Sequence, residues 1–205
     1  MPFDPILFEQ TPGFLAIAEG EHLFRLARAA ALHGPCLEVG SYCGRSTVCI
    51  GLACREAAQV LIAVDHHRGS EEQQPGEEYF DPGLVDPLSG RVDTFGRFRA
   101  TLARAELEAS VIPVVCSSGT AARAWQRPLS LAFIDGGHAP ATVLADADAW
   151  SPHLVVGGLL ALHDVFPDPA DGGRGPYLAY RAALASGRFS PHSIIGSLAV
   201  LRRVR

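Results

Sequence analysis

The residues of this chain that are best suited to chemistry begin in the stretch 36–46, CLEVGSYCGRS, which predicts a short strand, a tight turn and a helix opening at about Ser46. Gly40 and Gly44 lie in the turn. Because glycine adopts positive φ and has no Cβ, such a turn lets a ligand lie against bare backbone over a helix N-terminus. Glu38 precedes the turn, and a carboxylate there favours a cationic ligand over a pyrophosphate. The G-x-x-x-G spacing also differs from the G-x-G-x-x-G of dinucleotide sites. A nucleoside with a cationic portion and no phosphate fits, and S-adenosylmethionine is such a ligand.

A second acidic residue, Asp65, ends the apolar run QVLIAVD, about 25 residues beyond the first turn. In doubly wound folds, an acidic residue at the end of the second strand accepts hydrogen bonds from the ribose hydroxyls. Asp65 occupies that place, so we expect it to hold the ribose. The alternative is that Asp65 only caps the turn that follows its strand.

Further polar residues follow two later apolar runs. The run FIDGGH carries Asp135 and His138, and the run LALHD carries His163 and Asp164. Because ligands of open α/β sheets bind beyond the carboxyl ends of the strands, we expect these side chains to converge beside the nucleoside pocket. Their carboxylates suit Mg²⁺ or Mn²⁺, and a directly bound imidazole favours Mn²⁺, Fe²⁺ or Zn²⁺. The alternative is that Asp164 caps a turn and His163 packs uncharged beneath it.

The elements that must position these residues alternate between strand and helix, which predicts a parallel sheet with helices on both faces. Strands are expected at 34–40, 59–65, 110–117, 129–135 and 158–164, with a terminal pair at 189–195 and 197–203. Helices are expected at 19–32, 45–56, 92–105, 119–125 and 140–151, and a last one from the Gly/Pro loop 167–176 to about residue 185. No repeat or linker marks a second domain, so residues 1–205 are predicted to form a single α/β domain.

One long polar segment, residues 66–91, interrupts this alternation. It is rich in Glu, Gln, Pro and Gly and shows no periodicity. Loops of this length in compact domains are usually lids or binding loops, so we predict a substrate lid. The alternative is a disordered surface excursion.

Composition excludes several classes of protein. The chain has 17 Lys and Arg against 22 Asp and Glu, a net charge of −5, which leaves no electrostatic footprint for nucleic acid or an anionic membrane. Its apolar runs are strand-sized, and its N-terminal residues lack the basic region of a signal peptide. The five cysteines form no C-x-x-C pair and are expected in the core of a protein from a reducing compartment. We therefore predict a cytoplasmic protein that binds neither nucleic acid nor membrane.

The stretch 38–46 and the later strand ends resemble the catechol and caffeoyl-CoA type O-methyltransferases, small class I methyltransferases that use a divalent metal. In that family an Asp ends the fourth strand, a base lies three residues later, and an acidic–amide pair ends the fifth strand. Asp135, His138 and the pair His163–Asp164 fall on those positions. Two positions depart from the pattern, because the base is usually Lys and the first member of the pair is usually acidic. The polar segment and the late Gly/Pro loop are similar to those of a bacterial subgroup of sugar and oligosaccharide O-methyltransferases.

The resemblance implies a Rossmann-like, doubly wound, mostly parallel sheet of seven strands with an antiparallel C-terminal strand. It implies that S-adenosylmethionine and a divalent metal, Mg²⁺ or Mn²⁺, assist methylation of an acceptor hydroxyl, and it allows a homodimer. The residues expected to bind the cofactor are Glu38, Gly40, Tyr42, Ser46, Asp65, His66, Ser118 and Asp135, although Tyr42 could instead only pack in the turn. The metal would be held by Asp135, His163 and Asp164. His138 would take the hydroxyl proton near neutral pH.

The acceptor is expected to be a hydrophilic small molecule, and a saccharide fits best. Carboxylates, amides and an aromatic face suit a polyhydroxylated ligand, and such side chains are frequent in the polar segment and the late loop: Arg68, Glu71, Glu72, Gln73, Gln74, Glu77, Glu78, Tyr79, Asp171, Arg174 and Tyr177. A non-sugar vicinal diol or phenol is the nearest alternative. Two other functions stay open at this point: an NAD-dependent oxidoreductase on the same fold, and a non-catalytic scaffold that kept a degenerate cofactor pocket.

Overall fold

The computed structural model describes residues 3–168 and 171–205. Within them, one seven-stranded sheet is built from β1 (Cys36–Val39), β2 (Leu61–Val64), β3 (Val111–Val114), β4 (Leu129–Ile134), β5 (Leu154–Leu162), β6 (Phe189–Ile195) and β7 (Leu198–Arg203). The strands lie in the order β3-β2-β1-β4-β5-β7-β6. Strands β1 to β5 are parallel, and β7 lies antiparallel between β5 and β6. The predicted Rossmann-like, mostly parallel sheet is confirmed.

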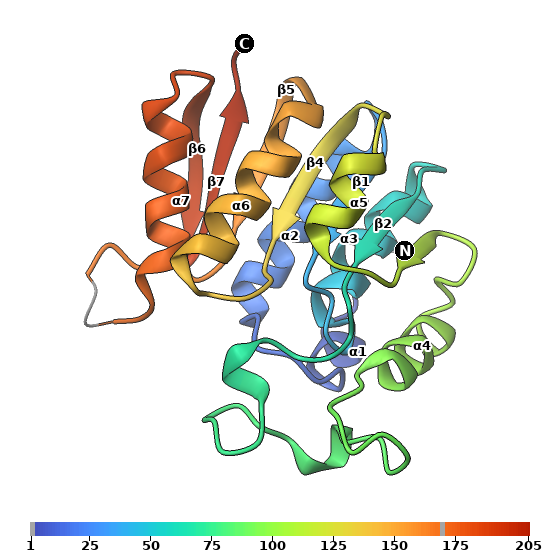
Figure 1. Cartoon of the computed structure of the whole chain (residues 1–205). Helices are drawn as coiled ribbons and strands as arrows, with labels where there is room; N and C mark the ends of the chain where they lie inside the picture. Colours follow the sequence, from blue (N-terminus) through green and yellow to red (C-terminus); the bar gives the residue numbers. More distant parts are fainter. Residues whose placement is uncertain (1–2, 169–170) are drawn as a thin grey trace.

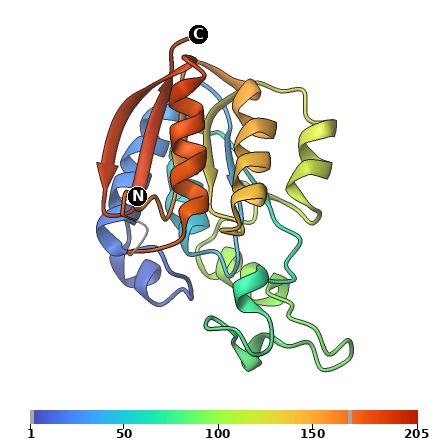
Figure 2. The same cartoon turned by 60° about the vertical axis from the view of Figure 1, so that its left-hand side comes forward.

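Helices cover both faces of the sheet (Figures 1 and 2). One layer contains α2 (Ile17–Ala30), α3 (Arg45–Glu56) and α4 (Phe95–Arg104), and the other contains α5 (Ser118–Ala124), α6 (Pro140–Trp150) and α7 (Arg174–Ala185). Successive side chains of a strand point to opposite faces. In β1, accordingly, Cys36 packs in the core under α2 and α3, whereas Leu37 and Val39 pack under α5 and α6. Apolar side chains on both faces of the central strands thus produce the continuous apolar runs seen in the sequence.

The structure differs from the predicted elements at the N-terminus of the chain and at one edge of the sheet. A short helix that the sequence does not predict, α1 (Pro5–Glu9), precedes α2 and buries only Phe8, which is too little to produce a helical pattern. β3, an edge strand, is shorter than the predicted 110–117. Ile112 and Val115 are exposed there, so part of this apolar run lies on the surface.

A third difference concerns β5, which begins at Leu154 and not at residue 158. Gly157 has a φ of +87° inside the strand, and the pairing with β4 shifts register between Leu129 and Leu131. The two adjacent glycines therefore mark an irregularity within the strand and not its start. The short helix η3 (Ser151–His153) connects α6 to β5. The predicted loop 167–176 contains residues 169–170, which lie outside the described part of the chain. Among the helices of residues 3–168 and 171–205, none has the length and apolar character needed to cross a membrane.

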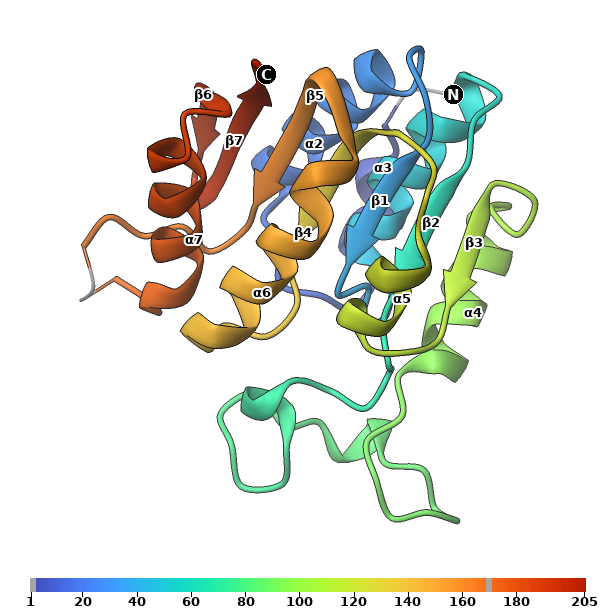
Figure 3. The same cartoon turned by 45° about the horizontal axis from the view of Figure 1, so that its top comes forward.

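The polar segment 66–91 lies beyond the carboxyl edge of the sheet, at the bottom of Figure 3, where it is drawn in teal to green. It contains two short helices, η1 (Glu71–Gln73) and η2 (Pro82–Leu84). Leu84 packs with Val92 and Cys43 in a small core of its own, and Arg68 forms an ion pair with Asp93 at 3.0 Å. The segment is therefore attached to the loop that follows β1.

At this edge the loop after β1 touches the loop after β4 without room for a side chain. Gly40 has a φ of +84°, and a Cβ placed on it would lie 2.2 Å from the carbonyl oxygen of Asp135. Only glycine meets both conditions, since other residues would have to adopt a left-handed conformation and also displace a backbone carbonyl.

We predict that Gly40→Ala lowers the free energy of unfolding by at least about 2 kcal/mol, because the backbone strain and the clash add. Gly76→Ala is the matched control, since Gly76 also has a positive φ, +97°, but a Cβ there would meet nothing within 4 Å. Urea unfolding should show a loss of about 1 kcal/mol for the control. Equal losses for the two variants would contradict the close approach of the loops.

Candidate active site

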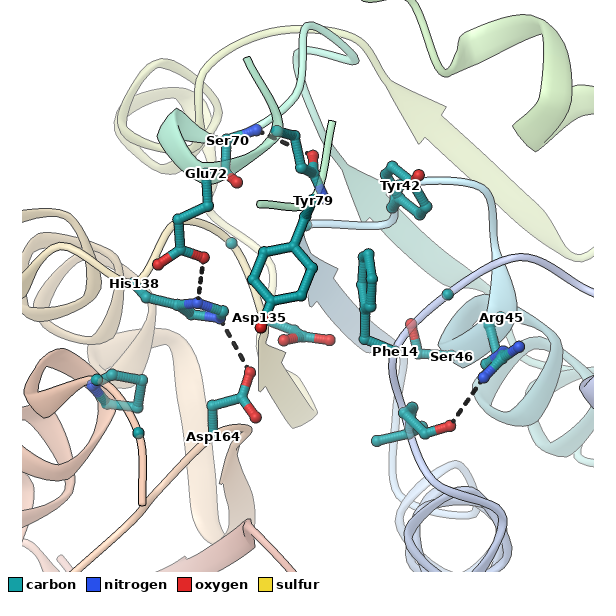
Figure 4. Close-up of a pocket in the computed structure, with 18 of the residues that line it drawn as sticks. Phe14, Tyr42, Arg45, Ser46, Ser70, Glu72, Tyr79, Asp135, His138 and Asp164 are labelled. Carbon is teal, nitrogen blue, oxygen red and sulfur yellow. Dashed lines mark hydrogen bonds and ion pairs between the residues drawn. The ribbon is translucent and has the colours of Figure 1, made fainter. Parts of the chain in front are cut away.

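A cavity of about 430 Å³ opens at the carboxyl edge of the sheet. Its wall is formed by the loops after β1, β4 and β5, by residues 12–15, by the polar segment and by the start of α7. Figure 4 shows Glu72, His138 and Asp164 on one side of it and Phe14 and Tyr42 on the other. The volume and the mixed lining are those of a small-molecule site.

The loop after β1 is held in place by Asp65. One carboxylate oxygen of Asp65 accepts the backbone N–H groups of Ser41 at 3.0 Å and Tyr42 at 2.8 Å, and the other accepts that of His67 at 2.7 Å. Tyr42 has a φ of +46°, so these bonds maintain a strained turn. Ser41 lines the cavity, and its buried hydroxyl finds no partner among the described residues. A buried polar group without a partner is costly.

Glu38, expected to bind the cofactor, lies beneath this loop and not in the cavity wall. It is fully buried, and its two carboxylate oxygens accept the hydroxyls of Ser46 at 2.6 Å and Thr47 at 2.5 Å. Burial raises the pKa of Glu38 to about 8, although both hydroxyls lower it. Glu38 therefore braces the start of α3 from inside the protein. Ser46 itself does line the cavity.

The four polar residues at the ends of β4 and β5 do converge. Nδ1 of His163 lies 3.1 Å from Asp135 and 3.3 Å from Asp164, and Nε2 of His138 lies 3.0 Å from the same oxygen of Asp164. The other ring nitrogen of His138 faces Glu72, from the polar segment, at 2.8 Å. Figure 4 shows His138 between these two carboxylates.

The charged groups of this cluster shift one another's pKa values. The pKa of His138 is raised to about 9, first by its hydrogen bond to Asp164. Burial opposes this shift, and the negative charges of Asp164, Glu72 and Asp135 add to it. This pKa exceeds the unperturbed value expected from the sequence. The pKa of His163 is also well above its ordinary value, because its acidic neighbours outweigh burial. Burial opposes ionisation of Asp164, but the two imidazoles hold its pKa well below the usual range. Any cation bound nearby would lower the imidazole pKa values again.

A residue that sequence reasoning missed, Glu19, completes the cluster from behind. It lies in the first turn of α2 and is 5% exposed, and one of its carboxylate oxygens lies 3.2 Å from Nε2 of His163. Burial raises its pKa, but hydrogen bonds from His163, Ala16 and Ser197 outweigh this and hold it at about 2. Glu19 is therefore ionised. In the sequence it reads only as an acidic residue near a helix start.

One group of the described residues has the spacing of a metal site. One atom each of Asp135, His138 and Asp164 lie within 4.8 Å of one another. His163, which was expected as a ligand, is not part of this group: its Nδ1 lies at hydrogen-bond distance from Asp135 and Asp164, at 3.1 and 3.3 Å, and its Nε2 faces Glu19. The group that could hold a divalent metal therefore contains His138 in place of the expected His163.

The two remaining expected residues lie elsewhere. His66 is half-exposed and lines a smaller cavity, of about 70 Å³, together with Asp65 and Asp135. Ser118 lines neither cavity. Its hydroxyl accepts the indole N–H of Trp150 at 2.9 Å and also contacts the buried Asp146, whose pKa is raised by burial.

Three aromatic rings of the cavity form contacts that the sequence did not predict. The ring of Phe14 lies 5.6 Å from that of Tyr42 and 5.2 Å from that of Tyr79. The contacts join three segments that are far apart in sequence. An exposed Phe before α2 carries no local signal for this role.

Known proteins share a domain with this chain. A family model described as a methyltransferase domain matches residues 37–165, which include both the loop after β1 and the ends of β4 and β5. The chain belongs to this methyltransferase family. The match confirms the predicted enzyme class and gives no support to an NAD-dependent oxidoreductase.

Solved structures support the same fold. The chain is similar to an O-methyltransferase from Bacillus cereus in complex with SAH, with a TM-score of 0.69, 16% identity, and coverage of 100% of this chain and 93% of that one. It is also similar to the O-methyltransferase TomG from Streptomyces achromogenes in complex with SAM, with a TM-score of 0.67, 14% identity, and coverage of 94% and 82%. A third similar structure is the SAH-bound methyltransferase PaMTH1 from Podospora anserina, with a TM-score of 0.69, 11% identity, and coverage of 94% and 80%.

The buried Glu38 predicts an unusual dependence of this methyltransferase's stability on pH. The folded protein keeps the proton of Glu38 up to about pH 8, whereas the unfolded chain loses it near the ordinary value of 4.5. Since the folded state binds more protons in this window, Glu38 lowers the free energy of unfolding as pH rises from 4.5 to 8, by up to about 1.4 kcal/mol per pH unit. Glu38→Gln, which resembles the protonated form, should reduce this slope in urea unfolding at pH 5 to 8. The exposed Glu21→Gln should not, and an unchanged slope in Glu38→Gln would refute the assignment.

Proposed function

We propose that the protein is an S-adenosylmethionine-dependent O-methyltransferase that methylates a hydroxyl of a hydrophilic small molecule, a saccharide in the first instance, with assistance from a divalent metal. The observation that carries the proposal is the shared cavity. Gly40, Ser41 and Tyr42 of the glycine turn and the Asp135–His138–Asp164 cluster line the same space, so a cofactor on the turn would face an acceptor at the cluster.

The turn after β1 has the properties of a cofactor cradle. Its backbone is bare at Gly40, where a Cβ would not fit, and Ser41 offers a buried hydroxyl. Tyr42, Ser46 and Asp135 complete this part of the wall. When bound, S-adenosylmethionine supplies a methyl group on a cationic sulfonium.

Asp65 and His66 would bind the nucleoside part of the cofactor in the smaller cavity. A carboxylate has about four acceptor positions, and three of those of Asp65 are taken by backbone N–H groups. Asp65 therefore has capacity for one ribose hydroxyl while it keeps the loop in place. Ser118 reaches the cofactor only if its contacts with Trp150 and Asp146 change.

Asp135 and Asp164 would hold the metal, which when bound would lower the pKa of an acceptor hydroxyl. His138 is the proton acceptor in this scheme. Its Nε2 faces the cavity wall beside Asp164, and Glu72 orients the ring through Nδ1. Both ring nitrogens are thus held by carboxylates, so His138 can take a proton from an acceptor only when a bound cation lowers its pKa and its contact with Asp164 is released.

The lining of the cavity supports a hydrophilic acceptor that is not anionic. Glu72, Asp135, Asp164 and Asp171 all line it, and their charge disfavours phosphates and acyl-CoA. Among the described residues of the wall, the one guanidinium is that of Arg45, which is turned to the backbone carbonyl of Thr11 at 2.7 Å. The rings of Phe14, Tyr42 and Tyr79 face the carboxylates across the cavity (Figure 4). A sugar matches this arrangement because it has an apolar C–H face and a rim of hydroxyls.

The three rings also favour a second acceptor class, a phenol or another flat vicinal diol, since an aromatic ring would stack against them. A screen of saccharides and catechols with labelled S-adenosylmethionine separates the two classes. Binding of the cofactor without turnover of any acceptor would instead indicate a non-catalytic scaffold.

The segment 66–91 is the proposed lid. Glu71 accepts the backbone N–H of Ala139 at 3.0 Å, Glu72 contacts His138, and Tyr79 packs on Phe14. The segment therefore touches the loop after β4 on one side of the cavity and the N-terminal residues on the other.

The cofactor assignment predicts a specific loss of affinity. Calorimetry should show micromolar or tighter binding of SAH to the wild type, and Asp65→Ala should weaken it by about 1.5–3 kcal/mol, because a charged acceptor is lost and the loop is released. Asp148→Ala, which changes an exposed carboxylate of α6, is the control.

EDTA should abolish methyl transfer while SAH still binds. Equal affinity of wild type and Asp65→Ala would remove Asp65 from the site, and full activity after exhaustive chelation would remove the metal.

The lid assignment predicts an effect on the acceptor alone. Tyr79→Ala should lower kcat/KM for the acceptor at least tenfold, about 1.4 kcal/mol in transition-state binding, without changing the affinity for SAH. Leu88→Ala is the control, because Leu88 lies in the same segment and is 96% exposed. If the two variants turn over every acceptor equally well, the segment is only a surface excursion.

A further inference from the structure

One carboxylate of the segment 66–91, that of Glu71, rests on the loop after β4. One of its oxygens accepts the backbone N–H of Ala139 at 3.0 Å. A Cβ placed on Gly137 would lie 2.7 Å from the other oxygen, so the carboxylate lies directly against bare backbone. Glu71 lines neither cavity, and no step of the proposed reaction uses it. We call its contact with Gly137 and Ala139 the Glu71 latch.

The latch gives α6 a cap that its own sequence lacks. Ala139 is the N-cap residue of α6, its side chain accepts no hydrogen bond, and the first turn of the helix contains no acidic residue. In a capping box, a Glu or Gln at the third helical position accepts the N–H of the N-cap residue, but α6 has Thr142 at that position. Glu71 takes this place from 68 residues earlier in the chain. The bond therefore caps α6 and anchors the segment at once.

The latch joins the two sides of the smaller cavity. Gly69, Ser70 and Gln73 of the segment line one part of it, and Gly136 and Gly137 of the loop after β4 line another. The cavity measures about 70 Å³, whereas small-molecule sites begin at about 300 Å³. A nucleoside therefore fits only after the segment and the loop have moved apart.

Asp65 and His66, the proposed partners of the nucleoside, line the same small cavity. Moving the segment away from the loop after β4 breaks the bond between Glu71 and Ala139. A second contact between the two parts, that of Glu72 with His138, belongs to the wall of the larger cavity. The Glu71 latch is thus the contact that closes the nucleoside side.

We propose that Glu71 is a positioning residue that latches the segment 66–91 onto the loop after β4, and that the nucleoside part of the cofactor enters only when Glu71 releases Ala139. The inference rests on the proposed binding of the nucleoside beside Asp65 and His66. The fraction of molecules with an open latch then scales the rate at which the cofactor associates. Tyr79 does not line the smaller cavity, so its effect on the acceptor is separate.

The experiment measures the association rate constant of SAH by surface plasmon resonance. SAH has no net charge near neutral pH, so loss of a carboxylate does not alter its electrostatic steering. Glu71→Ala should raise the rate constant about 3- to 10-fold, the effect of one hydrogen bond on the open fraction. Glu71→Gln keeps an oxygen that accepts the N–H and should stay within about twofold of the wild type. Glu78→Ala, which removes an exposed carboxylate of the same segment, should match the wild type.

Gly137→Ala opens the same latch from the other side. The backbone of Gly137 is not left-handed, and the three heavy atoms nearest to an added Cβ all belong to the carboxylate of Glu71. Alanine should therefore displace that carboxylate alone and raise the rate constant by a similar factor. Combining it with Glu71→Ala should add nothing, because both changes remove one contact. Gly96→Ala is the control, since a Cβ there would meet nothing within 4 Å.

Hydrogen exchange without SAH tests the latch separately from the cofactor. The N–H of Ala139 is bonded to Glu71, so NMR should show faster exchange at this amide in Glu71→Ala and Gly137→Ala than in the wild type, Glu78→Ala and Gly96→Ala. Unchanged exchange at Ala139 would overturn the latch.

Equal association rate constants of the wild type and Glu71→Ala would overturn the proposal. So would a faster rate in Glu71→Ala without one in Gly137→Ala, or effects that add in the double variant. In each of these cases SAH still binds, and the methyltransferase assignment stands. A wild type that binds no SAH would overturn the assignment and the proposal together.

Discussion

The register of the parallel strands is the constraint on which the site depends. Val39 pairs with Val64 and Ile134, and Ile134 pairs with Leu162, so four strands end at one level. The residues that follow these ends are Gly40, Asp65, Asp135 and His163. Backbone bonds continue the ladder through them, from Gly40 to Val64 at 3.0 Å, from Asp135 to Val39 at 2.8 Å and from His163 to Ile134 at 3.2 Å. A slip of one residue would turn every one of these side chains to the other face.

This dependence on register explains what the sequence can predict. Asp65, Asp135 and His163 each end an apolar run, and the rule that parallel strands share a carboxyl edge is enough to bring them together. The fold follows from the same runs. The sequence does not show contacts between segments that are not paired with each other in the sheet. Glu19 lies in a helix start and Phe14 precedes it, and neither has a local pattern that points to the site.

The buried position of Glu38, which the sequence reading did not anticipate, has a similar origin. Its place before a glycine turn predicts a carboxylate near a ligand, but alternation along β1 sends its side chain into the protein. There the hydroxyls of Ser46 and Thr47 satisfy it. Strand periodicity alone could have indicated the direction, since Glu38 falls on the same face as Cys36, under α2 and α3. The identity of the hydroxyl partners required the structure.

Carboxylates and imidazoles alternate from the segment 66–91 into the core, and they differ in how far they are exposed to solvent. Side-chain exposure falls from 37% at Glu72 to 27% at His138 and 26% at Asp164, and then to 4% at His163 and 6% at Glu19. Each imidazole lies between carboxylates, so no charge of the series is buried without a partner, which would be costly. Interactions strengthen as water is excluded, so the proton between His163 and Glu19 is the most firmly held of the series. His138 lies at the wet end, within reach of solvent and of the cavity. It is therefore the imidazole that we propose as the proton acceptor, while His163 is held between carboxylates on both sides.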